Sequence, residues 1–314
     1  VGFEAGKAVT TGAANTFIGA LAGDGTDNGN ENTALGMSAL TSNCGDNNTA
    51  VGHTSLGACT GEKNTAVGHD SGAAVTTGTL NTFIGAEAGD GTDDGASNTA
   101  VGYASLSANC GNSNTATGRY ALTNCTGGNN TALGDQAGNN CTSGSNNSFL
   151  GKDAGITGSP GGNLTTGSNS IFVGDENIDG AHIQIDWTVA SDERDKTDFT
   201  ALDLGLDFVK AMKPYTFKWD KRSKYGDKTA DDYDLNAITS DGTHKEDWLD
   251  LGFKAQDIKA LEEASNYKIA DKTNLTVSIT DDGKQYGMKY AKLVPILVKA
   301  IQELEARVAT LEGE

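Results

Sequence analysis

The sequence predicts an all-β repetitive solenoid or β-roll shaft over residues 1–180, followed by a small α+β domain that ends in a coiled-coil helix. Three observations predict this arrangement. A short motif recurs every sixteen or seventeen residues, 35 of the 42 glycines precede residue 187, and all three tryptophans lie from Trp187 onward. A fixed short period rich in turn residues is typical of stacked coils, and the change of composition marks a domain boundary.

Each repeat contains Asn, then Thr or Ser, then two or three apolar or small residues and a Gly. The motifs begin at residues 15, 32, 48, 64, 81, 98, 114, 130, 147 and 169, with spacings of 16 or 17 until the last, which is 22. Side chains alternate across a strand, so the Thr and the fourth residue, such as Ile18 or Val51, share one face. We expect that face to be the core. Asn and Gly suit turns that need positive φ or a side-chain bond to the main chain, so each coil should hold one very short strand.

A longer period lies on top of the short one. AVTTGAANTFIGA at 8–20 returns as AVTTGTLNTFIGA at 74–86, and Phe17, Phe83 and Phe149 are each 66 residues apart. Four coils therefore make one super-repeat. A single coil buries little apolar surface, so stability should come from stacking, capping and association of several chains.

The charge balance argues against two classes of partner. The net charge is −19, of which −13 lies before residue 187 and −6 after it. Both halves are acidic, so neither a nucleic-acid backbone nor an anionic membrane is an expected partner. No run of about 18 apolar residues occurs, so no membrane span is expected. The start at Val1-Gly2-Phe3 suggests a fragment of a longer protein.

The cysteines do not form a metal or redox motif. None belongs to a CxxC pair, and two of them recur 66 residues later, which indicates a structural position. Coils stacked about 4.8 Å apart could bring cysteines within pairing distance, but we expect free, buried packing thiols. The five cysteines are Cys44, Cys59, Cys110, Cys125 and Cys141.

Two acidic loops and a histidine pair are the candidate metal ligands. The loops at 22–32 and 88–98 match a calcium-binding EF-hand only in part, because Thr26 and Leu35 fall where an acidic residue is needed. We therefore expect solvated turns, with Ca²⁺ a weak alternative and no other cofactor. His53 and His69 follow the motif where other coils carry Tyr, Arg, Asp or Lys, so we assign no metal there.

The second half has the pattern of a compact α+β domain. Alternation after Ile183 predicts a junction strand over 181–190. Further along the chain we expect a helix end at 208–214, a strand at 215–219, an irregular stretch at 220–247, a strand leading into a helix at 251–264, and a hairpin strand at 275–280.

The tail carries a short heptad seam. Its residues are spaced 4, 3, 4 and 3, as in a coiled coil, and the alternative is that the seam covers an adjacent domain. With Ile or Val at one seam position and Leu at the other, the pattern favours a coiled coil of two helices as readily as one of three. It therefore does not determine the number of chains. The seam residues are Leu297, Ile301, Leu304, Val308 and Leu311.

Four segments in order carry a specific resemblance. SDERDK at 191–196, KPYTFKWD at 213–220, LGFKAQDI at 251–258 and the tail from Tyr286 resemble the endosialidase-type intramolecular chaperone of phage tail spikes and fibres. The repeats resemble tail-fibre shafts and, more loosely, the β-roll heads of trimeric bacterial adhesins. The resemblance implies that residues 191–314 trimerise the chain and template the folding of the shaft.

The resemblance also implies self-cleavage by a Ser/Lys dyad in a Ser-Asp-x-Arg-x-Lys motif. Ser191 would be the nucleophile, Lys196 the base, Asp192 and Arg194 orienting residues, and Ala190–Ser191 the scissile bond. A serine needs a base, and a lysine can serve where burial lowers its pKa. The alternative is a polar helix start with Ser191 as N-cap.

The expected function is a homotrimeric phage tail fibre in the virion tail that attaches to the host surface. Expected partners are copies of itself, a host glycan or protein receptor, and other tail proteins through a preceding segment. Any enzyme activity would be a single self-cleavage as a serine endopeptidase. Alternatives are a bacterial trimeric adhesin, a glycan depolymerase, which needs paired carboxylates in a groove, and, more distantly, a self-cleaving membrane-tethered transcription factor.

Overall fold

The computed structural model describes residues 1–184, 188–228, 230 and 232–313. The chain forms two compact units, Val1–Asn177 and Ile178–Glu314, and each is described separately. Among the described residues, no helix combines the length and the apolar character needed to cross a membrane.

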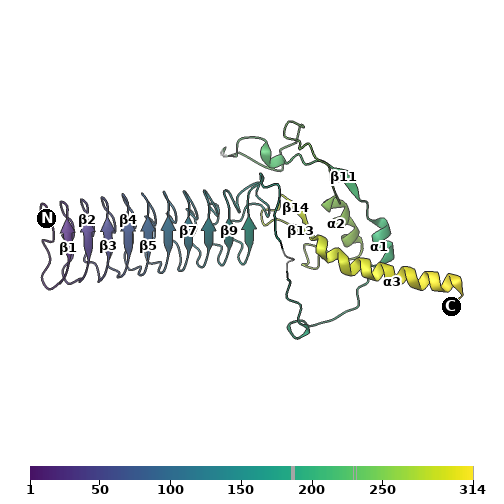
Figure 1. Ribbon diagram of the computed structural model, residues 1–314, viewed down its shortest axis with the longest axis horizontal. Helices are drawn as coiled ribbons and strands as arrows, with labels where there is room; N and C mark the ends of the chain where they lie inside the picture. The colour runs from purple at the N-terminus through teal and green to yellow at the C-terminus, as the bar shows by residue number, and fades with distance from the viewer. Residues whose placement is uncertain (185–187, 229, 231, 314) are drawn as a thin grey trace. The chain divides into compact units, whose positions relative to one another are not determined.

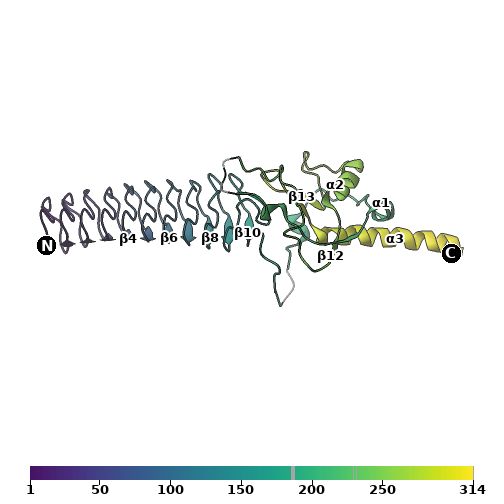
Figure 2. The same ribbon diagram turned by 90° about the horizontal axis from the view of Figure 1, so that it is seen from above.

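The first unit is a β-solenoid, as the repeat predicts. Among the described residues ten three-residue strands form one parallel sheet, and each strand pairs with the next along the chain (Figure 1). The strands lie on one side of the coils (Figure 2). They are β1 Thr16–Ile18, β2 Thr33–Leu35, β3 Thr49–Val51, β4 Thr65–Val67, β5 Thr82–Ile84, β6 Thr99–Val101, β7 Thr115–Thr117, β8 Thr131–Leu133, β9 Ser148–Leu150 and β10 Ile171–Val173.

The face of the strands that forms the core is the opposite of the one predicted. The middle residue of each strand points inward, and Ala66 and Phe83 are fully buried. The fourth motif residue points outward, so that Leu35 is 46% exposed and Leu150 is 49% exposed. A coil of sixteen residues has too narrow an interior for a branched side chain at every level, whereas alanine fits and lets the walls approach. The branched apolar residues of the strands are therefore left on the outer face.

Size complementarity inside the coils explains the 66-residue super-repeat. The phenylalanine ring of Phe83 lies against Gly72 and Gly89, where an added Cβ would come within 3.0 and 2.6 Å of the ring. Where neither the coil itself nor the next one has phenylalanine as its inward strand residue, the position of these glycines is taken by a buried leucine, as at Leu56 and Leu106. Large and small side chains thus alternate along the shaft, which keeps its interior filled.

An asparagine ladder runs through the shaft. The backbone N–H of Asn64 donates to Oδ1 of Asn48 at 3.0 Å, and Asn64 Oδ1 accepts from the N–H of Asn81 at 3.0 Å. Asn64 Nδ2 donates to the Gly78 carbonyl at 2.9 Å. The ladder thus joins each coil to the next with buried hydrogen bonds. Its members are Asn15, Asn32, Asn48, Asn64, Asn81, Asn98, Asn114, Asn130 and Asn147.

The last coil differs from the motif spacing by one residue. Ser170, not Asn169, donates its backbone N–H to Asn147 Oδ1 at 3.0 Å, and Phe172 pairs with Phe149. The register step is therefore 23 residues where the motif suggests 22, and a serine replaces asparagine at the end of the ladder.

All five cysteines are free and buried inside the solenoid, as expected. Burial raises the pKa of the Cys59 thiol to about 12 and also raises the pKa of Cys110. The reactive thiolate of these two residues is therefore scarce at pH 8, and all five thiols are buried away from the reagent. We expect iodoacetamide at pH 8 to label no cysteine of the native protein and all five after denaturation, as counted by intact mass. A cysteine that reacts in the native protein would contradict this packing.

Among the described residues the second unit contains the short helices α1 and α2, the longer helix α3 and two antiparallel strand pairs, in the order that the sequence predicts. Strand β11 pairs with β12, and β13 pairs with β14. Its elements are η1 Glu193–Asp195, α1 Leu206–Ala211, β11 Tyr215–Phe217, η2 Arg222–Lys224, β12 Asp250–Gly252, α2 Ala255–Ala264, β13 Val277–Ile279, β14 Tyr286–Met288, η3 Tyr290–Lys292 and α3 Leu293–Glu312. The junction strand expected over 181–190 falls partly on residues 185–187, outside the described residues; 181–184 and 188–190 are not in a strand.

Helix α3 has a buried face and a separate exposed seam. Leu293 and Ile296 pack with Phe208 of α1 in the unit's apolar core, and Ala300 is also buried. Further along α3, the Glu303 carboxylate accepts a 2.7 Å hydrogen bond from the backbone N–H of Leu206 at the start of α1. The heptad seam is a different stripe and is exposed, with Ile301 at 66% and Leu304 at 51%.

Candidate functional site

The segment from Ser191 to Lys196 folds back in a single turn. Asp192 is the N-cap of η1, and its side chain accepts a hydrogen bond from the backbone N–H of Arg194 at 2.9 Å. The turn ends where the N–H of Lys196 donates to the Glu193 carbonyl at 3.1 Å. Asp192, not Ser191, is therefore the cap, because its carboxylate reaches the second residue of the turn.

This turn brings the two residues of the expected dyad into contact. The amine Nζ of Lys196 lies 2.6 Å from Oγ of Ser191 and 3.1 Å from the Ser191 carbonyl oxygen. A base must lie within about 2.6–3.2 Å of the proton that it removes. The geometry thus meets the first requirement for activating the serine hydroxyl.

Asp192 and Arg194 form a bidentate ion pair beside the dyad. Arg194 Nε lies 3.0 Å from Asp192 Oδ1, and its terminal nitrogen lies 2.6 Å from Oδ2. Hydrogen bonds from the Arg194 side chain hold the pKa of the Asp192 carboxyl below its usual value. Asp192 therefore stays ionised, and its bonds to Arg194 keep the turn closed.

The site is exposed in the single chain. Every described residue of 188–201 is exposed, including Ala190, Ser191 and Lys196. Removal of an amine from water is what favours its neutral form, the form that can accept a proton. For the Lys196 amine to be removed from water, another part of the protein or another copy would have to cover this segment.

One aspartate of each acidic loop forms a hydrogen bond within the shaft. Asp27 bonds to the hydroxyl of Thr10 in the preceding coil, and Asp93 bonds to Thr76 in the same way. These aspartates therefore link successive coils at equivalent positions of the two super-repeats.

The structure also places three potential metal ligands close together, although the sequence analysis did not combine them into a site. The donor atoms of His53, His69 and Asp70 all lie within 4.8 Å of one another. The sequence did carry a signal, namely histidine at the same motif position in two successive coils.

Comparison with known proteins identifies one domain. Residues 191–267 match the family described as chaperone of endosialidase, and the match begins at Ser191. The chain therefore carries an endosialidase-type chaperone domain behind its β-solenoid, an arrangement like that of a tail fibre or tail spike. No curated protein and no solved structure matches the chain.

Proposed function

We propose that this chain is the C-terminal part of a homotrimeric phage tail fibre, in which the solenoid is the shaft and the chaperone domain aligns and trimerises the chains. The fibre would engage a host glycan or protein receptor as part of the virion tail and join other tail proteins. The observation that carries the proposal is that both units expose an uncharged apolar stripe in the single chain. Three copies of the chain are the occupants that would cover these stripes.

The shaft stripe is suited to packing against copies of itself. It consists of the outward-facing last residue of each strand, and no charged side chain occurs among them, although the residues before 187 carry a net charge of −13. A charge in such a column would meet its own copy and repel it. The stripe comprises Ile18, Leu35, Val51, Val67, Ile84, Val101, Thr117, Leu133, Leu150 and Val173.

The helical stripe provides the clamp. The seam residues of α3 are 42 to 87% exposed and do not form the face that packs on α1. Exposed apolar residues with heptad spacing are the usual contact of a coiled coil. A shaft with many long-range contacts forms slowly and risks misregister, so a clamp that gathers the chains would set their alignment.

The clamp is tested by a charge placed in the seam. With Ser191→Ala present to keep the chain uncut, we expect the full chain to have three times the mass of one chain in light scattering. Ile301→Glu should lose this assembly, because a charge at a buried seam position costs several kcal/mol, whereas Gln302→Glu, one residue off the seam, should keep it. A monomeric Ser191→Ala protein, or normal assembly of either Ile301→Glu in that background or a chain ending at Ala190, would contradict the proposal.

Self-cleavage would use the dyad once. Oγ of Ser191 would attack the carbonyl carbon of Ala190 while the Lys196 amine takes the hydroxyl proton and returns it to the departing backbone nitrogen of Ser191. Water would then hydrolyse the resulting ester, leaving a carboxylate on Ala190. Packing of another copy over residues 188–201 would supply the desolvation that the single chain lacks.

Release of the clamp would leave a kinetically stable shaft. A product without its template cannot realign its chains after unfolding, so its lifetime depends on the unfolding barrier rather than on equilibrium. A cut at the junction is the one position that frees the whole chaperone domain from the whole shaft.

A further inference from the structure

We propose that His53, His69 and Asp70 form a binding site for a divalent transition-metal ion, Zn²⁺ above all, that links two coils of the shaft. The two imidazole rings are stacked, with ring centres 5.1 Å apart and planes 14° from parallel. Asp70 Oδ2 lies 3.1 Å from His69 Nδ1, and Asp70 Oδ1 lies 4.0 Å from His53 Nδ1. The carboxylate thus reaches toward both rings.

The donor set fits such an ion. Two imidazole nitrogens and one carboxylate oxygen suit Zn²⁺ and its neighbours, whereas Ca²⁺ and Mg²⁺ prefer oxygen alone. Tetrahedral zinc holds its ligand atoms about 3.4 Å apart, and the three donors lie within 4.8 Å of one another. Small side-chain rotations therefore complete the site, and water can occupy the remaining position.

The backbone holds the ligands in place. Strand β3 ends two residues before His53, and β4 ends two residues before His69, and the two strands pair in register at Val51 and Val67. The N–H of Asp70 donates to the His53 carbonyl at 3.0 Å. The ligands come from adjacent coils whose spacing is fixed by the sheet, which favours binding because little order has to be created.

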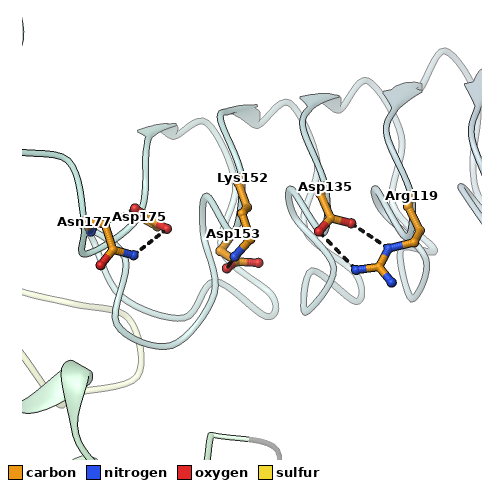
Figure 3. Close-up of polar contacts among 6 residues, drawn as sticks. All are labelled: Arg119, Asp135, Lys152, Asp153, Asp175 and Asn177. Carbon is orange, nitrogen blue, oxygen red and sulfur yellow. Dashed lines mark hydrogen bonds and ion pairs between the residues drawn. The ribbon is translucent and has the colours of Figure 1, made fainter.

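The second super-repeat shows what these positions do elsewhere in the shaft. The residues 66 positions further on are Arg119 and Asp135, which form a bidentate ion pair with distances of 2.9 and 3.1 Å (Figure 3). That pair links its two coils directly. The two imidazoles at the same positions cannot pair with each other in this way, and a cation bound by both rings and by Asp70 would provide the equivalent link.

A matched control, called the transplant, replaces the three ligands by the residues at the equivalent positions of the second super-repeat. The variant His53→Arg, His69→Asp, Asp70→Gln places the residues of positions 119, 135 and 136 in the first super-repeat, so it removes all three ligands while restoring a coil-to-coil ion pair. His182→Gln removes a histidine elsewhere. Titration of the full, metal-stripped chain with ZnCl₂ should give one site per chain in the wild type and in His182→Gln, and loss of binding in the transplant.

Thermal unfolding and spectroscopy complete the test. Zn²⁺ should raise the unfolding temperature of the wild-type shaft by mass action, EDTA should reverse this, and the transplant should respond to neither. Co²⁺ should give visible absorption bands that the transplant lacks. Absence of Zn²⁺ binding by the wild type, or binding that persists in the transplant, would overturn the proposal. The outcome is independent of chain number and of self-cleavage.

Discussion

Replacement of Ser191 by alanine is expected to leave the chain at its full mass, whereas the wild-type chain is expected to yield a shaft ending at Ala190 and a chaperone fragment beginning at Ser191. The alanine lacks the hydroxyl oxygen that lies 2.6 Å from Lys196 Nζ, so no acyl transfer can begin. Denaturing electrophoresis with intact-mass measurement separates the two results. The effect should be complete, because no other step can replace a missing nucleophile.

The matched controls come from the same turn. Glu193→Gln and Asp195→Asn change the two variable positions of the motif, so both should cleave as the wild type does. Lys196→Arg keeps the positive charge but supplies no neutral amine, so it should remain uncut. Cleavage in the Ser191→Ala chain would place the nucleophile elsewhere, and an intact wild-type chain would leave residues 191–314 with the clamp role alone.

The repeat allowed the shaft to be predicted as a β-solenoid, but not which side of each strand is inside. The alternating direction of side chains along a strand defines two faces but does not determine which one is buried. Hydrophobicity alone favours burial of the face with Ile18 and Leu35 over the face with Ala34 and Ala66. The narrow coil reverses that preference. The exposed stripe is the surface that the proposed trimer would cover.

The asparagine ladder could also not be predicted from the repeat motif. Asparagine next to glycine is common in turns, and its occurrence in nearly every coil was the one signal of a buried role. The hydrogen bonds that join Asn64 to the coils on both sides depend on a register that only the folded stack provides.

In the chaperone domain, local sequence patterns predict where helices and strands lie but not which faces and side chains make contact. The helices and strand pairs fall where the local patterns place them, because Pro214 and the turn at 281–283 limit them within a few residues. The division of α3 between a face for its own core and a separate seam could not be predicted, since both faces are apolar. Likewise, a spacing of five residues gives no contact between Ser191 and Lys196 until η1 folds the chain back.

Gly68→Ala is expected to prevent a coil of the shaft from closing. The φ angle of Gly68 is +147°, a conformation that L side chains rarely adopt, and an added Cβ would lie 2.3 Å from the carbonyl oxygen of Gly85 in the next coil. That carbonyl is backbone held by the sheet and cannot move aside without breaking the stack. Strain at such a residue costs about 1–3 kcal/mol, and the clash brings the expected loss to at least about 4 kcal/mol.

The loss should spread along the stack, because each coil is stabilised chiefly by its neighbours. Hydrogen exchange should show lost protection in the coils around β4 and β5, together with a lower unfolding temperature or no soluble shaft. Gly180→Ala is the matched control, since its nearest new contact is the movable side chain of His182 at 3.3 Å. If the two variants unfold at the same temperature, the close approach of successive coils at Gly68 does not determine the stability of the shaft.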